Sequence, residues 1–87
     1  MDDFKQRLAS VVLAAMRSPR PPCELDGANL VDLLGISSVD ALEVLISVEI
    51  AFGIEIPDED LDVALVSSLD ALGAYVRRRQ AADNDAV

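Results

Sequence analysis

The chain has 87 residues, of which seven are basic and sixteen acidic, so its net charge is −9. A chain of this length forms one small domain with a core of limited stability. It has no histidine and a single cysteine, so the commonest general base is absent and no disulfide can form within the chain. Its longest apolar run, Val11 to Met16, is too short to cross a membrane, and its first residues lack the basic segment of a secretory signal. These features predict a cytoplasmic protein.

The charges are unevenly distributed along the chain. All seven basic residues lie outside the 56 residues from Pro21 to Val76, and this stretch carries twelve acids. Phosphate binding requires a basic patch, so the composition argues against a nucleic-acid partner. It favours a partner with a basic surface, attracted over long range. The alternative is that the acidity serves only solubility.

Helical periodicity predicts a first helix that begins after Asp2 or Asp3. We expect it to end near Arg17, because the prolines that follow cannot continue a helix. The segment 19–29 is then expected to form a loop that leads to a turn at Gly35.

The main helix is expected to begin at Ser37 or Ser38 and to end at Gly53, a residue that commonly terminates helices. It has two apolar stripes where an ordinary surface helix has one. The core stripe comprises Ala41, Val44, Leu45, Val48 and Phe52. The second stripe comprises Val39, Leu42, Ile46 and Ile50, with Glu43 and Glu49 at its edges. An apolar stripe with an acidic border indicates a docking surface, and the alternative is a helix buried on all sides.

After an extended link, the pattern predicts a short third helix over Asp58 to Leu65, with acids in its first turn. These acids do not form a calcium-binding loop, because Val63 and Leu69 stand where that loop requires glycine and glutamate. We therefore predict no metal site. A last helix follows Ser67 or Ser68 and is expected to end with the cations of residues 77–79 in its last turn.

The two serines at the start of the main helix have different expected roles. One serine is enough to cap a helix, and Ser37 forms a loose capping box with Asp40 three residues later. Ser38 would then lie in the first turn with its hydroxyl facing solvent. The positive end of the helix dipole favours a phosphate at this position. A serine that receives a phosphodiester, next to an apolar docking stripe with an acidic border, is typical of a carrier protein.

Two motifs of the chain resemble those of the acyl carrier protein family. The run Leu34-Gly35-x-x-Ser38-Val39-Asp40-x-x-Glu43 resembles the attachment motif LGxDS(L/I/V)xxxE. The run FGIEIPDE, residues 52–59, is similar to the family's F-x-x-x-I-P-D-E, at the same spacing from the first motif. Ser67-Ser68-Leu69 and Tyr75-Val76 are similar to the family's closing helix, so the resemblance covers about Phe4 to Arg79.

The resemblance implies an all-α fold, a four-helix bundle of acyl carrier type with a short third helix. We expect a single carrier domain over residues 1–80 and a disordered tail over 81–87, which has little to bury. The resemblance further implies that a phosphopantetheinyl transferase moves 4′-phosphopantetheine from coenzyme A onto Ser38. The thiol of this arm would hold acyl groups as thioesters. The chain itself would be a non-catalytic monomer.

The implied partners are acyl-loading and condensing or modifying enzymes with basic docking patches, in polyketide, fatty-acid-like or other secondary-metabolite biosynthesis. The expected partner-docking residues are Val39, Asp40, Leu42, Glu43, Ile46, Glu49 and Ile50. The expected lining of an acyl pocket is Ala41, Val44, Leu45, Val48, Ile56, Leu61, Leu65 and Leu72. An aliphatic core with a short third helix has few contacts that hold this helix in place, so local opening should be cheap.

Two positions depart from the family pattern. Ser37 replaces the aspartate that usually precedes the attachment serine and that is thought to help the transferase arrange its metal and phosphate. Ile50-Ala51 replaces residues that are often acidic in fatty-acid carriers. Both departures favour a specialised carrier of secondary metabolism. The alternatives are a peptidyl or aminoacyl carrier, whose motif tends towards LGGxS, and an unmodified helical adaptor that only docks through the main helix.

Overall fold

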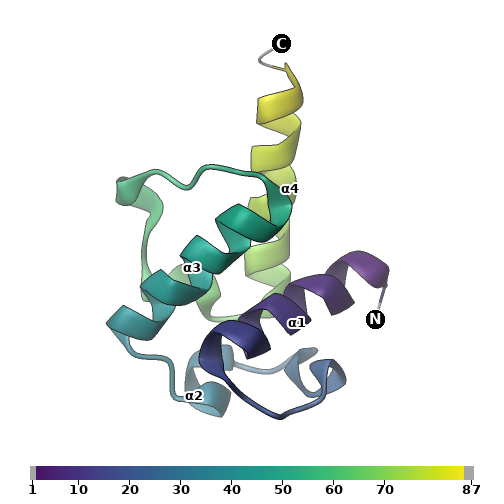
Figure 1. Cartoon of the computed structure of the whole chain (residues 1–87), viewed down its shortest axis with the longest axis vertical. Helices are drawn as coiled ribbons and strands as arrows, with labels where there is room; N and C mark the ends of the chain where they lie inside the picture. The colour runs from purple at the N-terminus through teal and green to yellow at the C-terminus, as the bar shows by residue number, and fades with distance from the viewer. Residues whose placement is uncertain (1, 86–87) are drawn as a thin grey trace.

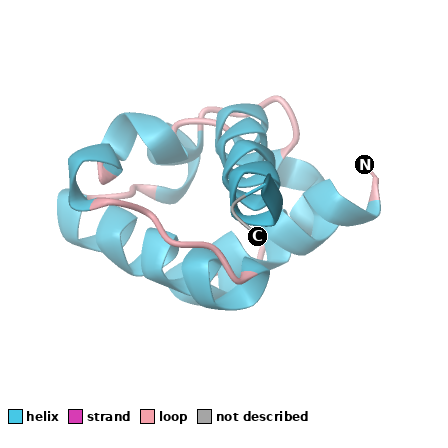
Figure 2. Cartoon of the chain, turned by 90° about the horizontal axis from the view of Figure 1, so that it is seen from above, coloured by secondary structure: helices cyan, strands magenta, loops and turns pink. Residues whose placement is uncertain are grey.

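The computed structural model describes residues 2–85, which form four α-helices and three short 3₁₀ helices. Figure 2 shows helices and loops, and no residue of the described part lies in a strand. Helix α1 packs along α3 and also contacts α4. The last turns of α4 project beyond the other helices (Figure 1). The prediction of an all-α, four-helix fold is confirmed.

Helix α1 (Asp3–Met16) begins and ends as its sequence predicts. Asp2 is the N-cap, and its carboxylate accepts a hydrogen bond from the backbone N–H of Lys5 at 2.7 Å. Arg17 ends the helix in the left-handed conformation, with φ of 54°. Local capping chemistry therefore sets both ends of α1.

The segment between α1 and the main helix contains two short helices, η1 (Pro22–Leu25) and α2 (Leu30–Leu34), that we did not predict. The side chain of Asn29 caps α2 by accepting a first-turn backbone N–H at 3.1 Å. Leu25 and Leu30 are fully buried, so these two turns close one end of the core.

Helix α3 (Ser38–Phe52) is the main helix, and Gly53 ends it with φ of 64°, a conformation that favours glycine. Its predicted core face is confirmed, because four of the five residues are at most 3% exposed: Ala41, Val44, Leu45 and Val48. The fifth, Phe52, is half-buried and packs against the ring of Phe4, with 5.5 Å between the ring centroids. Burial of this face holds α3 in the bundle.

The short third helix predicted over Asp58 to Leu65 is not one continuous helix. Two 3₁₀ turns, η2 (Asp58–Asp60) and η3 (Val63–Val66), occupy this region. Between them Leu61 and Asp62 have extended backbone. The Asp62 carboxylate accepts the backbone N–H two residues further on at 3.1 Å, and so begins a new turn instead of continuing the first.

We call residues 57–66 the strap. Its η3 turn contacts both α3 and α4. Val66 is its only fully buried side chain, and the others are half-buried or exposed. The link before the strap alternates as predicted, with Ile54 and Ile56 buried and Glu55 exposed. The strap therefore has fewer buried residues than any of the long helices.

Helix α4 (Leu69–Asp85) is longer than predicted. The Ser68 hydroxyl caps it by accepting a first-turn backbone N–H at 3.0 Å, as expected of one of the two serines. Residues 81–85 are helical where we expected a disordered tail, while 86–87 lie outside the described residues. Alanines 81 and 82 favour helix and can extend α4 without any core contact. The domain boundary at residue 80 stays a prediction.

The cations of residues 77–79 consequently lie in the middle of α4 and not in its last turn. They make tertiary contacts there. The Arg77 guanidinium lies over the ring of Phe4, 4.3 Å from its centroid. Nε of Arg79 donates to the backbone carbonyl of Glu55 at 3.1 Å. These arginines bind α4 to α1 and to the link after α3.

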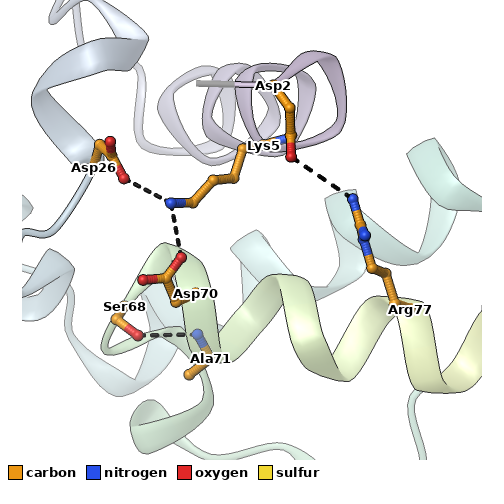
Figure 3. Close-up of polar contacts among 7 residues, drawn as sticks. All are labelled: Asp2, Lys5, Asp26, Ser68, Asp70, Ala71 and Arg77. Atoms are coloured by element: carbon orange, nitrogen blue, oxygen red, sulfur yellow. Dashed lines mark hydrogen bonds and ion pairs between the residues drawn. The ribbon is translucent and has the colours of Figure 1, made fainter.

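Lys5 joins three parts of the chain, as Figure 3 shows. Its Nζ lies 2.6 Å from a carboxylate oxygen of Asp26 and 2.8 Å from one of Asp70. The hydrogen bond to Asp26 is the main cause that raises the pKa of Lys5, and the same bond lowers the pKa of Asp26. Arg77 faces Asp2 at 3.9 Å in the same view. Solvent screens these pairs, so they orient α1 more than they stabilise it.

A single aliphatic core connects all of these elements. Its largest fully buried side chains are Leu8, Val12, Leu25, Leu30, Val44, Leu45, Val48, Val66, Leu69, Leu72 and Val76. Tyr75 is the one aromatic side chain among the buried residues. No polar or charged side chain other than this phenol is buried among the described residues.

Candidate functional site

The N-terminus of α3 has a complete capping box. The Ser37 hydroxyl accepts the backbone N–H of Asp40 at 3.2 Å, and the Asp40 carboxylate accepts the backbone N–H of Ser37 at 3.1 Å. This confirms the capping role predicted for Ser37. Both polar groups of Ser37 are therefore used by the fold.

Ser38, the first residue of α3, is exposed. Its hydroxyl makes none of the side-chain hydrogen bonds found among residues 2–85. The capping box leaves the backbone N–H groups of Ser38 and Val39 without a protein acceptor in the described part of the chain. These groups and the helix dipole make the surroundings of the Ser38 hydroxyl favourable for an anion.

A cleft of about 300 Å³ begins at Ser38 and lies between α3 and the strap. Its lining is mainly aliphatic and consists of Ser38, Ala41, Leu42, Leu45, Leu61, Asp62 and Val63. A carboxylate and a hydroxyl are therefore its only polar side chains. The cleft can accept an apolar chain that starts at the Ser38 side.

The structure brings three of the eight predicted pocket residues to this cleft, namely Ala41, Leu45 and Leu61. Four others are buried in the core: Val44, Val48, Ile56 and Leu72. The eighth, Leu65, is half-buried and packs against the core. The assignment of all eight to an acyl pocket stays a prediction.

Sequence reasoning did not place Leu42, Asp62 or Val63 in the pocket, and the backbone gives a physical reason for Val63. In a helix Leu61 and Leu65, four residues apart, would share a face. In the extended backbone found at 61–62, residues two apart share a side, so Val63 joins Leu61 in the cleft. The alternation of apolar and acidic residues from Leu61 to Val63 was the signal that could have indicated this.

The second apolar stripe of α3 lies on the surface, which excludes the alternative of a helix buried on all sides. The exposed fractions are 68% for Val39, 44% for Leu42, 45% for Ile46 and 79% for Ile50. Such a contiguous apolar stripe is typical of an interaction surface. Its role in docking stays a prediction.

The three acids among the predicted docking residues have different surroundings. Glu43 is exposed and makes no ion pair or hydrogen bond with another side chain in the described part. Asp40 is held in the capping box. Glu49 is half-buried, and its carboxylate accepts the backbone N–H of Ile56 at 3.0 Å. Glu43 is therefore the acid whose charge is most accessible to a partner.

Other kinds of site have little support in the described residues. No group of three His, Cys, Asp or Glu side chains there is arranged to hold a metal ion. No described helix has the length and apolarity needed to span a bilayer. The cysteine, Cys23, is exposed and lies in η1, away from the cleft lining.

Comparison with known proteins agrees with this geometry. Residues 6–76, most of the chain, match the family described as the phosphopantetheine attachment site. The mitochondrial acyl carrier protein of Neurospora crassa is 32% identical over 75 residues, which are 86% of this chain and 54% of that protein. The acyl carrier protein of Rhodopseudomonas palustris (strain BisB18) is 32% identical over 65 residues, which are 75% of this chain and 81% of that protein. No solved structure matches significantly.

A helical fold with an exposed serine at the start of a helix, beside an apolar cleft, agrees with this family match. The chain belongs to the acyl carrier protein family and contains its phosphopantetheine attachment site. It spans about half the length of the Neurospora relative and most of the Rhodopseudomonas relative. The cofactor implied by the family is 4′-phosphopantetheine, and an exposed hydroxyl at a helix N-terminus beside a cleft fits this group.

Proposed function

We propose that this chain holds acyl intermediates as thioesters on a 4′-phosphopantetheine arm attached to Ser38 and delivers them to partner enzymes. One observation carries the proposal: the exposed hydroxyl of Ser38 stands where the cleft between α3 and the strap begins. An arm attached at this point could lead its cargo either into the cleft or to a partner. The chain itself would do no chemistry on the cargo.

The surroundings of the two serines favour Ser38 as the modified residue. Ser37 uses its hydroxyl and its backbone N–H in the capping box, so modification there would remove a helix cap. Ser38 can accept a phosphodiester without losing a hydrogen bond of the fold. The helix dipole and the unpaired N–H groups of the first turn would stabilise the phosphodiester charge.

The capping geometry also explains how the chain tolerates Ser37 where the family usually has aspartate. Serine and aspartate are equally good N-caps, so the start of α3 is kept. The substitution removes one carboxylate beside Ser38. We expect the transferase still to modify Ser38, although the attachment site carries one negative charge fewer than is usual in the family.

The cleft and the second apolar stripe of α3, hereafter the outer stripe, support the two tasks of a carrier, which are to shelter its cargo and to dock to partner enzymes. Each methylene of a cargo chain that leaves water for the cleft would contribute about 0.8 kcal/mol. The exposed stripe and Glu43 would contact the transferase and the loading, condensing or modifying enzymes. Polyketide, fatty-acid-like or other secondary-metabolite biosynthesis stays the predicted pathway, and the cytoplasmic location and monomeric state stay predictions. The Neurospora relative is named as a mitochondrial protein.

The exposed apolar stripe also fits a second function, that of an unmodified adaptor that only docks through α3. The two functions differ in covalent chemistry. A carrier gains the mass of the arm, and an adaptor does not.

Intact-protein mass after incubation with coenzyme A and a phosphopantetheinyl transferase of broad specificity tests the proposal. We expect the wild-type chain to gain one arm and Ser38→Ala to gain none. The matched control is Ser37→Ala, which should lose about 1 kcal/mol of stability with the cap and still be modified. Modification of Ser38→Ala but not of Ser37→Ala would contradict the assignment, and an unmodified wild-type chain would favour the adaptor.

A further inference from the structure

The strap is anchored at both ends by hydrogen bonds of the neighbouring residues. Before it, the backbone N–H of Ile56 donates to Glu49 at 3.0 Å, and Nε of Arg79 donates to the carbonyl of Glu55 at 3.1 Å. After it, the backbone N–H of Leu30 donates to the carbonyl of Ser67 at 2.8 Å. The strap therefore runs between two attached points.

Within the strap the backbone hydrogen bonds are local. Asp60 donates to Pro57 at 2.9 Å, Leu61 to Asp58 at 3.2 Å, and Leu65 to Asp62 at 3.0 Å. In the described part of the chain, one hydrogen bond joins the strap to an α-helix. It runs from the Tyr75 hydroxyl on α4 to Oδ2 of Asp60, at 2.7 Å. This bond pins the middle of an otherwise locally bonded segment.

The two partners of this bond are well suited to hold it. Tyr75 is only 8% exposed, so its ring has a defined position in the core. Burial first, and the bond to Asp60 second, raise the pKa of Tyr75 to about 12, so the phenol remains a donor at neutral pH. Asp60 is half-buried, and hydrogen bonds to carboxylates are stronger than those between neutral groups.

Asp60 immediately precedes the three strap residues that line the cleft, Leu61, Asp62 and Val63. Asp60 therefore lies at the start of the wall that faces Ala41 and Leu45 on α3. The strap offers little other resistance, because most of its side chains are only half-buried or exposed.

We propose that Tyr75 and Asp60 are positioning residues that set the width of the cleft, and that a long cargo chain must break their hydrogen bond to enter. The bond keeps the cleft narrow when it is empty or holds only a short acyl group. A short acyl group fits without moving the strap, whereas a longer chain pushes Leu61 and Val63 outward. This inference rests on the proposed function, because it assigns the cleft to the cargo.

Hydrogen–deuterium exchange of the unmodified protein tests the pin without any cargo. Tyr75→Phe removes the hydroxyl and keeps the ring. We expect amides in 61–66 to exchange on the order of tenfold faster in this variant, with α1 and α3 unchanged. Asp60→Ala should have the same effect. Asp60→Asn keeps an acceptor oxygen, so the strap amides should retain most of their protection from exchange. Unchanged strap exchange, or equal acceleration throughout the molecule, would overturn the proposal.

Melting temperatures of acetyl- and octanoyl-loaded protein test the effect on cargo. In the wild type the octanoyl chain must break the Tyr75–Asp60 bond, but in Tyr75→Phe it need not. The octanoyl-minus-acetyl difference should therefore be larger in Tyr75→Phe and near the wild-type value in Asp60→Asn. If a variant lowers the melting temperatures of the acetyl and octanoyl forms equally, its effect is only structural. That result would contradict a role for the bond in setting the width of the cleft. If no arm can be attached to Ser38, the proposed function is refuted, but the exchange result on the unmodified protein still stands.

Discussion

Helix α3 and the strap form the two walls of one cleft, but the fold holds them in different ways. Four of the five residues on the inward face of α3 are at most 3% exposed, and the ends of the helix are set by the capping box and by Gly53. The strap consists of two 3₁₀ turns with an extended break between them, and among the described residues one side-chain hydrogen bond joins it to α4. One wall is therefore part of the core, whereas the other lies on it.

This difference matters for a carrier. The attachment serine has to be presented in one geometry to a transferase, and α3 provides that rigidity. The cargo varies in length, and a wall that can move without unfolding the core can adapt to it. Under the proposed function, the chain would combine a fixed attachment point at Ser38 with an adjustable shelter for the cargo.

The largest expected effect comes from matched truncations of the two walls. Leu45→Ala removes a fully buried side chain of α3 and should lower the free energy of unfolding by about 2–5 kcal/mol. Leu61→Ala removes the same atoms from the half-buried strap and should cost roughly 1 kcal/mol or less. Equilibrium denaturation with urea measures both values. Equal costs at the two sites would show that the strap is as firmly packed as α3.

A smaller effect is expected from two charge reversals on α3. Glu49→Lys removes the acceptor of the Ile56 N–H and should speed exchange of that amide, because the strap loses an anchor. The Glu43 side chain makes no hydrogen bond or ion pair with the strap in the described residues, so Glu43→Lys should leave exchange of the strap amides unchanged. Both reversals should slow association with the transferase and weaken the salt dependence of its rate. Each lost charge contact should reduce the binding free energy by about 1 kcal/mol or less.

Stopped-flow association rates across a series of salt concentrations, together with amide exchange, separate these effects. Rates that are unaffected by either reversal would show that the acidity serves only solubility. Faster strap exchange in Glu43→Lys would show that the two walls are coupled more widely than the contacts of α3 indicate.

Much of the long-helix architecture could be predicted because its determinants are local. Asp2, Ser37 and Ser68 each cap a helix through a hydrogen bond within a few residues, and Gly53 ends α3 through its own backbone. The two stripes of α3 follow from helical spacing alone. These features need no knowledge of the rest of the fold.

The strap and its contacts could not be predicted in the same way. The Asp62 side chain competes with the backbone for hydrogen bonds, and this broke the expected helix where periodicity alone favoured one. The pairing of Tyr75 with Asp60, and of Glu49 with Ile56, depends on how distant segments pack. The sequence places Glu49 at the edge of the second stripe, but it does not indicate that this carboxylate accepts the backbone N–H of Ile56.

The central claim is that a cargo attached through Ser38 lies between the fixed wall and the adjustable one. Isotope-filtered nuclear Overhauser measurements on holo-protein loaded with a ¹³C-labelled octanoyl chain test it most directly. We expect contacts from the chain to Leu45 on α3 and to Leu61 and Val63 on the strap. Contacts to Val39 and Ile50 on the outer stripe instead, or to no protein group, would contradict the account.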